Sequence, residues 1–280
     1  MSTWLITGAS RGFGLEITRE ALVQGHQVAA TARDTAALHA AFPDVGDALL
    51  SVPLDVTDER QAHAAVRAAV DRFGGIDVLV NNAGRGVLGA VEEISDGAAR
   101  SVFDTNVFGS LNVLRAVLPV MRPRRSGHVI NISSVGGFTA GSGWGVYAAT
   151  KFAMEGFSEA LQQELAPLGI QVTIVEPGRF RTDFLDASSL HTEETALPDY
   201  AASAGATREA SAEGNHAQPG DPVKAARIIV GLGQDPAAPL RVQLGADAVA
   251  RVEAKLDFVR DELAAWRGLS LSTDHDATAA

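Results

Sequence analysis

The sequence WLITGASRGFG at residues 4–14 joins a short apolar run to a glycine-rich turn. The run at 4–7 shows no alternation of apolar and polar residues, which is typical of a strand buried on both faces. Apolar residues then recur at helical spacing, so we expect a helix over 14–24 that ends at Gly25. A strand, a glycine turn and a helix in this order are typical of the first unit of a parallel α/β sheet.

Apolar runs and helical stretches alternate along most of the remaining chain. We expect strands over residues 4–7, 27–32, 48–54, 76–80, 128–133, 171–176 and 240–244. We expect helices over residues 14–24, 34–41, 58–73, 95–121, 145–168, 223–232 and 246–266. Strict alternation with short connections predicts a doubly wound α/β fold, with seven strands in a mainly parallel sheet and helices on both faces.

Residues 183–222 break this pattern and are rich in Ala, Ser, Thr and Glu. Irregular stretches of this length in a compact domain are usually lids, binding loops or disordered segments, and we expect a substrate lid here. No linker divides the chain. We therefore expect a single catalytic domain over 1–268 and a flexible tail over 269–280.

The composition excludes several classes of protein. With 34 acidic and 23 basic residues the formal net charge is −11, which argues against a nucleic-acid partner. The absence of cysteine rules out disulfides, thiolate metal sites and cysteine nucleophiles, and we expect no metal site. The chain begins without a signal-like segment and has no apolar run of about 18 residues, so we expect a cytoplasmic protein with no membrane partner.

The glycine turn supports two different readings. Its TGxxxGxG pattern at 7–14 suits a backbone that approaches the phosphates of a dinucleotide at a helix N-terminus. The same residues contain a GxSxG around Ser10, which is typical of the nucleophile elbow of an α/β-hydrolase. Such an elbow usually lies later in the chain, before an acid and a histidine, so the dinucleotide interpretation is favoured.

The stretch YAATK at 147–151 places Tyr147 and Lys151 one helical turn apart. A phenol with its ordinary pKa of about 10 is a poor acid or base at neutral pH, and a neighbouring ammonium stabilises the phenolate. The chain has only two tyrosines and only three lysines, so the pairing is a specific signal. It predicts a proton-transferring pair.

Two further polar stretches follow expected strands. Ser134 comes directly after the strand at 128–133, and NNAG at 81–84 follows the strand at 76–80. Because ligands bind at the carboxyl ends of parallel strands, we expect both stretches at the same edge of the sheet as Tyr147. A serine hydroxyl there can hold a substrate oxygen while the tyrosine moves a proton.

Seven motifs in order carry a resemblance to a known family: TGASRGFG at 7–14, LDVTD at 54–58, NNAG at 81–84, TNVFG at 105–109, NISS at 131–134, YAATK at 147–151 and EPGRFRT at 176–182. Together they resemble the short-chain dehydrogenases/reductases, over roughly residues 3–250. The nearest branch is the one named for 17β-hydroxysteroid dehydrogenases, whose members act on varied substrates. The resemblance implies a single-domain Rossmann fold and an NAD(P)-dependent oxidoreductase.

The resemblance also implies roles for individual residues. Tyr147 would be the general acid in ketone reduction and the base in alcohol oxidation. Lys151 would lower the pKa of Tyr147 and bind the nicotinamide ribose. Ser134 would bind the carbonyl oxygen, and Asn106 would hold a water that links Lys151 to solvent. Every catalytic position of the family pattern is filled.

The residues that the resemblance assigns to the cofactor are Gly8, Ser10, Arg11, Gly12, Phe13, Gly14, Arg33, Asp55, Val56, Asn82, Ala83, Gly84, Tyr147, Lys151, Pro177, Gly178 and Thr182. The second strand decides which nicotinamide is favoured. An NAD enzyme usually carries a carboxylate at the end of this strand, where this chain has Ala32 followed by Arg33. Arg33 and Arg11 together suit a 2′-phosphate, although a slip of one residue would offer Asp34 to a ribose. We expect NADP(H) rather than NAD(H).

The side chains expected around the substrate carbonyl are Val87, Phe138, Trp144 and Phe184. Their apolar character indicates a hydrophobic ketone or secondary alcohol, although Phe138 and Trp144 would serve equally well as core residues. We therefore expect an NADPH-dependent carbonyl reductase. The alternative is a sensor or scaffold that binds NADP(H) without turnover. Family resemblance further implies a homodimer or homotetramer packed through its long helices.

Overall fold

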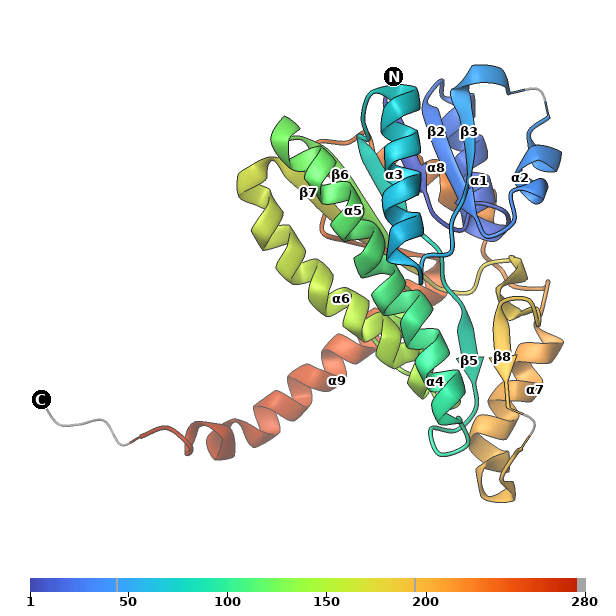
Figure 1. Ribbon diagram of the computed structural model, residues 1–280. Coiled ribbons are helices and arrows are strands. Elements are labelled where there is room, and N and C mark those ends of the chain that lie inside the picture. Colours follow the sequence, from blue (N-terminus) through green and yellow to red (C-terminus); the bar gives the residue numbers. More distant parts are fainter. Residues whose placement is uncertain (44, 194, 276–280) are drawn as a thin grey trace, which may run out of the picture.

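Seven parallel strands form the central sheet of the protein in this computed structural model (Figure 1). The structure describes residues 1–43, 45–193 and 195–275. The strands, in chain order, are β1 (Thr3–Ile6), β2 (Gln27–Ala32), β3 (Leu49–Pro53), β4 (Val78–Asn81), β6 (Gly127–Ile132), β7 (Ile170–Pro177) and β9 (Arg241–Leu244). They lie in the order β3-β2-β1-β4-β6-β7-β9, and every pair is parallel. The predicted doubly wound α/β fold is confirmed.

Helices cover both faces of this sheet because each presents one apolar side to it. On one face lie α3 (Glu59–Phe73), α5 (Gly109–Arg124) and α6 (Gly145–Leu165), which share a buried cluster with the sheet. The other face carries α1 (Gly12–Val23), α2 (Ala36–Ala41) and α8 (Pro222–Leu232), with a second buried cluster. The chain order changes direction between β1 and β4. This switch point is where parallel α/β sheets bind their ligands.

The helix expected over 95–121 consists of three parts. These are α4 (Asp96–Phe103), one π-helical turn η2 (Asp104–Phe108) and α5, which extends to Arg124. The spacing of apolar residues does not reveal a π-helical turn. Its one extra residue rotates the apolar face of the following helix by only part of a turn.

The segment 183–222 contains more structure than its composition suggested. It holds η5 (Asp183–Leu185), β8 (Leu190–Thr192), η6 (Pro198–Tyr200), the π-helical turn η7 (Ala201–Gly205) and α7 (Ala206–Glu213). β8 pairs with β5 (Gly86–Leu88) in a second, two-stranded parallel sheet that the sequence analysis did not foresee. The expectation of an irregular segment was wrong for these elements, because contacts distant in sequence order them.

One such contact joins α7 to the segment after β5. Arg208 Nη1 lies 2.6 Å from Glu93 Oε2, whose side chain is fully buried. The backbone N–H groups of Leu197 and Ala90 also donate to this carboxylate, each at 2.8 Å. These bonds and the Arg208 guanidinium lower the pKa of Glu93 to about 2. The carboxylate is therefore ionised at neutral pH and fastens the segment to the rest of the protein.

The C-terminal helix α9 (Ala246–Leu271) projects away from the sheet (Figure 1). It continues past the expected end at 266, so the prediction of a flexible tail from 269 was wrong for 269–271. Residues 276–280 of the expected tail lie outside the described residues.

Short 3₁₀ turns complete the structure: η1 (Gly46–Ala48), η3 (Val135–Gly137) and η4 (Ala166–Leu168). Among the described residues, no helix combines the length and apolar character needed to cross a membrane.

Candidate active site

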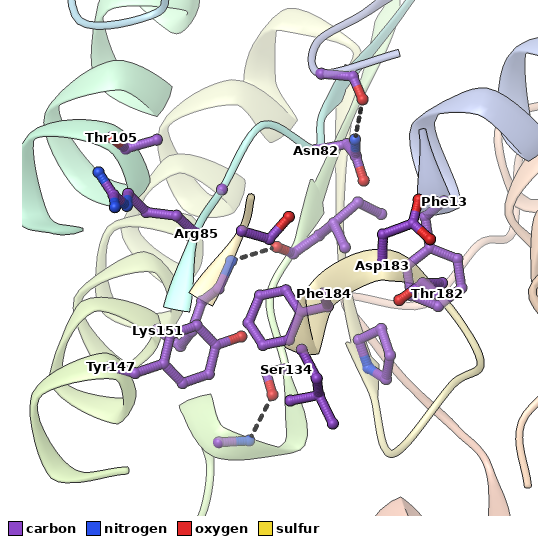
Figure 2. A pocket seen from close by; sticks show the side chains of 18 of the residues that line it. Phe13, Asn82, Arg85, Thr105, Ser134, Tyr147, Lys151, Thr182, Asp183 and Phe184 are labelled. Carbon is purple, nitrogen blue, oxygen red and sulfur yellow. Dashed lines mark hydrogen bonds between the residues drawn. The ribbon is translucent and has the colours of Figure 1, made fainter. Parts of the chain in front are cut away.

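A cavity of about 1300 Å³ lies at the carboxyl ends of the central strands. It runs from the glycine turn after β1, past the ends of β4 and β6, to the N-terminal part of α6. Residues 182–185, 188 and 189 line part of one side. Figure 2 shows that the polar ends of Ser134, Tyr147 and Lys151 all face this cavity. The fold therefore brings Ser134 together with Tyr147 and Lys151, the three residues expected to be catalytic.

Tyr147 and Lys151 occupy the first two turns of α6. Both side chains are buried, at 7% and 4% exposure, and the Lys151 ammonium lies 6.0 Å from the centre of the Tyr147 ring. Lys151 Nζ donates a hydrogen bond of 2.8 Å to the carbonyl oxygen of Ile132, at the end of β6. This bond fixes the ammonium between the phenol and the sheet.

Burial changes the acidity of both groups. Desolvation raises the pKa of Tyr147 to about 12, and the side chain of Ser134 opposes this effect. Desolvation lowers the pKa of Lys151 to about 8, and the nearby carboxylate of Glu155 opposes that effect. Lys151 is therefore still mainly an ammonium at pH 7. Tyr147 is protonated at pH 7, and the expected lowering of its pKa by Lys151 is not among the causes of its shift, because desolvation outweighs the opposing hydrogen bond from Ser134.

Ser134 follows β6 and begins the 3₁₀ turn η3. Its Oγ accepts a hydrogen bond of 2.9 Å from the backbone N–H of Gly136, so the hydroxyl hydrogen remains directed to other acceptors. This bond fixes the hydroxyl beside Tyr147 at the wall of the cavity. Ser134 and Tyr147 can then donate to the same substrate oxygen.

Asn106 lies fully buried in the π-helical turn η2, behind the catalytic pair. Its Oδ1 accepts from the backbone N–H of Arg85 at 2.9 Å. Its Nδ2 donates to the Arg85 carbonyl at 2.9 Å and to Thr150 Oγ1 at 3.0 Å. Thr150 in turn donates to the Tyr147 carbonyl at 2.7 Å. The amide therefore ties Arg85, the residue before β5, to α6, and its expected role in holding a water stays a prediction.

The glycine turn adopts the conformation that a phosphate-binding backbone requires. Gly8 and Gly12 have φ of 64° and 53°, which residues with a side chain rarely adopt. A Cβ on Gly14 would overlap the carbonyl oxygen of Gly8 and lie 2.6 Å from Asn82 Nδ2. Asn82 Nδ2 itself donates to the carbonyls of Thr7 and Gly8, at 2.8 and 3.1 Å. The NNAG segment thus holds the backbone of the glycine turn in place through the Asn82 side chain.

The first turn of α1 points into the same cavity. Arg11 at the N-cap forms no side-chain cap, and the first turn of this helix carries no acidic residue. The helix N-terminus is therefore available to an anion. All but one of the seventeen residues expected at the cofactor line the cavity, and the exception is Gly14, which packs against the turn. The cavity, the glycine turn and this helix end fit an extended dinucleotide.

Arg33, Asp34 and Arg11 all line the end of the cavity beyond β2. Asp34 Oδ1 accepts from the backbone N–H of Ala36 at 2.9 Å. Arg33 is exposed, and no ion pair engages it among the described residues. Arg11 Nη2 donates to the carbonyl of Ser188 at 2.9 Å, so this guanidinium also contacts the segment 183–222. Within this group the Asp34 carboxylate has a backbone partner, and the Arg33 guanidinium has no ion-pair partner among the described residues.

The aromatic residues divide between the cavity and the core. Trp144 and Phe184 line the cavity and surround Tyr147, with ring centres 5.6 and 5.5 Å from the phenol. Val87 is 1% exposed and packs behind Tyr147, away from the cavity lining. Phe138 packs against α9, with Val135, Ala248 and Val252. The structure therefore brings two of the four expected substrate residues to the cavity and places the other two in apolar packing.

A buried charge cluster under the site was missed by the sequence analysis. Arg241 Nε on β9 lies 3.0 Å from Glu155 Oε2 and 3.3 Å from Glu176 Oε1, and Arg241 also pairs with Glu159. Desolvation raises the pKa of Glu155 to about 7 and also raises the pKa of Glu176. The sequence signal that could have revealed this cluster is Glu155, an acidic residue four positions after Lys151 on the buried face of α6.

Two alternative chemistries receive little structural support. No histidine hydrogen-bonds to Ser10 in the described part of the chain, so the hydrolase elbow lacks its base.

Asp183, Asp186 and His216 bring possible metal-ligand atoms within 4.8 Å of one another. Asp186 already accepts from Asn215 Nδ2 at 2.7 Å and pairs with His216 at 3.0 Å, so hydrogen bonds within the segment 183–222 already engage two of the three side chains.

Comparison with known proteins gives a consistent family. The family model for short chain dehydrogenases matches residues 2–193. Oxidoreductase BOA17 of Botryotinia fuckeliana is 37% identical over 271 residues, which cover 96% of this chain and 98% of that protein. A 3-ketodihydrosphingosine reductase of Bacteroides thetaiotaomicron is 42% identical over 198 residues, which cover 70% of this chain and 71% of that protein. The crystal structure of a short-chain dehydrogenase from Streptomyces avermitilis matches with a TM-score of 0.89 at 44% identity, covering 98% of this chain and all of that one.

Two further solved structures of this fold hold different nucleotides. A short-chain dehydrogenase/reductase from Burkholderia phymatum, 23% identical with a TM-score of 0.82 over 100% of this chain and 98% of that one, contains NAD. A serine dehydrogenase, 30% identical with a TM-score of 0.74 over 86% of this chain and 94% of that one, contains NADP⁺. The family model spans more than half of the chain, and similar proteins match it almost from end to end. The chain belongs to the short-chain dehydrogenase family of oxidoreductases.

Proposed function

We propose that this oxidoreductase is a carbonyl reductase, reversible as an alcohol dehydrogenase, which uses NADP(H) and acts on hydrophobic ketones or secondary alcohols. The observation that carries the proposal is the convergence of Ser134, Tyr147 and Lys151 on one wall of the cavity. A protein that only binds the nucleotide needs the glycine turn but has no use for a buried phenol beside a buried ammonium.

The protein's own groups supply position and a proton. Ser134 Oγ and the Tyr147 hydroxyl hold the carbonyl oxygen, and Tyr147 donates its proton as the alcohol forms. The Lys151 ammonium lies 6.0 Å from the phenol ring and stabilises the phenolate that remains. When bound, the nicotinamide supplies the hydride that the substrate carbon accepts. In the opposite direction the Tyr147 phenolate takes the proton of the alcohol.

The preference for NADP(H) is supported by the residues after β2. Arg33 and Asp34 both line the cavity, but one oxygen of the Asp34 carboxylate already accepts a hydrogen bond from the Ala36 backbone N–H at 2.9 Å, whereas the Arg33 guanidinium forms no ion pair among the described residues. A guanidinium at this position suits a 2′-phosphate, and a carboxylate suits a ribose diol. Related structures hold either nucleotide, so the preference comes from these side chains alone.

The substrate class is supported by the rings around Tyr147. Trp144 and Phe184 lie 6.4 Å apart with nearly stacked planes, and both line the cavity next to the phenol. They offer an apolar surface to the part of the substrate that flanks its carbonyl. The name of the Bacteroides relative, a reductase of 3-ketodihydrosphingosine, agrees with a ketone of lipid character.

Five expectations from the sequence stay predictions. They are membership of the branch named for 17β-hydroxysteroid dehydrogenases, a cytoplasmic location, the single-domain boundaries, the lid function of 183–222 and assembly through long helices.

The cofactor preference is tested by the kcat/KM values for NADPH and NADH with a series of apolar ketones. A charge-assisted hydrogen bond contributes about 1.5–3 kcal/mol, so Arg33→Ala should lower kcat/KM for NADPH roughly tenfold to a hundredfold and leave NADH nearly unchanged. Arg67→Ala, an exposed arginine on α3, is the matched control and should change neither value. Equal use of both nucleotides by the unaltered protein would refute the NADP(H) assignment and leave the reductase itself standing.

A further inference from the structure

The C-terminal helix α9 carries an apolar stripe that the rest of the molecule does not cover. Only Ala248 and Val252, in its first turns, are buried against the protein. Beyond them, Leu256, Val259, Leu263 and Trp266 are 47%, 45%, 58% and 63% exposed. We call these four residues the α9 stripe. Figure 1 shows this part of the helix extending away from the sheet.

The spacing of the α9 stripe is that of a coiled coil. Its members follow one another at intervals of three, four and three residues, and Val249 and Val252 continue the same series toward the N-terminus. Apolar residues at alternating intervals of three and four form a narrow line that packs against a second helix. The stripe spans about 15 Å between Leu256 and Trp266 at 1.5 Å per residue.

The charges on α9 favour another copy of this helix over a lipid surface. Between Arg251 and Arg267, four bases (Arg251, Lys255, Arg260 and Arg267) are balanced by four acids (Glu253, Asp257, Asp261 and Glu262). The fifth acid of α9, Asp247, lies in its first turn and accepts a hydrogen bond from the backbone N–H of Arg179 at 2.9 Å. Helices that lie on membranes usually carry an excess of Lys and Arg on their polar face. A stretch without net charge can instead approach its own copy without net repulsion, although the whole chain has a net charge of −11.

The flanking charges are complementary in an antiparallel pair. When Val259 of one helix lies opposite Leu263 of the other, Leu256 lies opposite Trp266. Glu253 and Arg267 flank the stripe on the same side, and each Glu253 then lies diagonally across from the Arg267 of the second copy. Neither Glu253 nor Arg267 forms an ion pair within the described residues. Arg260 and Glu262 would each lie close to their own copy at the twofold axis. Arg260 is already paired with Asp257 at 2.7 Å, and the two Glu262 carboxylates lie on the solvent-exposed edge of the contact. A parallel pair would align Arg267 with Glu262 but would also bring Lys255 against Arg260.

From these observations we propose that the α9 stripe is a docking surface for a second copy of this chain, and that the two α9 helices pack antiparallel. The pair has twofold symmetry, so the same surface serves both subunits. It places the two sheets at opposite ends of the helix pair. This contact is separate from the active site and does not depend on the proposed reaction.

Cross-linking tests the contact directly, because the full-length chain contains no cysteine. Val259→Cys places one thiol on the stripe, and Asp261→Cys places one on the opposite side of the same helix. With a short bismaleimide, Val259→Cys should give a covalent dimer in high yield and Asp261→Cys should give almost none. Equal yields from the two variants, or none from Val259→Cys, would overturn the proposal.

Substitution then tests the register. Leu263→Glu should raise the dissociation constant of this contact on the order of a hundredfold, measured by sedimentation velocity, because it removes two buried leucines from the pair. Phe258→Glu, an exposed residue off the stripe, is the control and should leave association unchanged. Glu253→Arg and Arg267→Glu should each weaken the contact, and the double variant should restore it. Failure of this rescue would contradict the antiparallel register.

Flotation with phosphatidylcholine–phosphatidylserine vesicles separates the membrane alternative. The proposal predicts that the protein stays unbound at physiological salt. Vesicle binding that is lost in Leu263→Glu, without cross-linking through Val259→Cys, would assign the stripe to a lipid surface and refute the proposal. None of these measurements uses catalysis, so an error in the proposed function leaves their outcome unaffected.

Discussion

His128 offers a quantitative test of the energetics of the sheet. It lies near the start of β6, at the end of the strand opposite Ser134, and is 3% exposed. Its Nε2 lies 2.9 Å from Thr173 Oγ1, and its Nδ1 has no partner among the described residues. Desolvation lowers the pKa of His128 from 6.5 to about 4, against a smaller opposing effect from Asp235. The imidazole is therefore neutral in the folded protein at pH 5.

The sign of the pH dependence follows from this lowered pKa. The unfolded chain binds a proton at His128 more tightly than the folded protein, so acid favours unfolding between pH 6.5 and 4. With those two pKa values, the free energy of unfolding falls by about 2 kcal/mol at pH 5, and by about 3 kcal/mol at pH 4, relative to neutral pH. Above pH 6.5 the effect vanishes.

Urea unfolding at pH 7.5 and pH 5.0 measures this contribution when the unaltered protein is compared with His128→Gln. Glutamine is uncharged at both pH values, so the variant should lose about 2 kcal/mol less unfolding free energy between them. The exposed His39→Gln on α2 is the control and should behave as the unaltered protein does. An equal loss in the His128→Gln variant and in the unaltered protein would refute the assignment of a buried neutral imidazole.

Two further predictions concern the active site. Glu155→Gln removes a carboxylate that raises the pKa of Lys151, so the loss of ketone-reducing activity as pH rises through about 8 should shift to lower pH. Glu164→Gln, exposed on the same helix, is the control and should leave the pH profile of kcat unchanged. An unchanged profile in Glu155→Gln would contradict the effect of this carboxylate on Lys151. Gly14→Ala should raise the Kd for the nucleotide more than tenfold and lower stability by about 1–3 kcal/mol, because the new Cβ overlaps the Gly8 carbonyl. Gly156→Ala on α6, where a Cβ meets nothing within 4 Å, should instead stabilise the protein slightly in a thermal melt, and equal binding by both variants would contradict the close approach at Gly14.

The central sheet was predictable from the sequence because its strands are buried on both faces. The strands Thr3–Ile6 and Val78–Asn81 each have three consecutive apolar residues, and glycine or polar residues follow them. The meeting of the three proposed catalytic residues at one cavity was predictable for a related reason. Tyr147 and Lys151 are four positions apart on one helix, and Ser134 directly follows a strand, so local spacing alone indicates where each side chain lies.

Features that depend on contacts distant in sequence could not be predicted. The pairing of β5 with β8 joins Gly86 to Leu190, and neither short strand has an apolar pattern of its own. The position of Phe138 depends on α9, which packs against it with Ala248 and Val252. The cluster of Glu155, Glu176 and Arg241 unites three elements, so only its helical member was visible from the neighbourhood of Lys151.

The role of Tyr147 is the central claim, and initial rates of NADPH oxidation with apolar ketones test it most directly. The unaltered protein should turn over at least one ketone. Tyr147→Phe should bind NADPH with unchanged affinity and lose roughly a hundredfold to ten-thousandfold in kcat, the usual contribution of a general acid. Undiminished turnover by Tyr147→Phe would contradict the account. So would NADPH binding without turnover of any ketone by the unaltered protein, which is the behaviour of a nucleotide sensor.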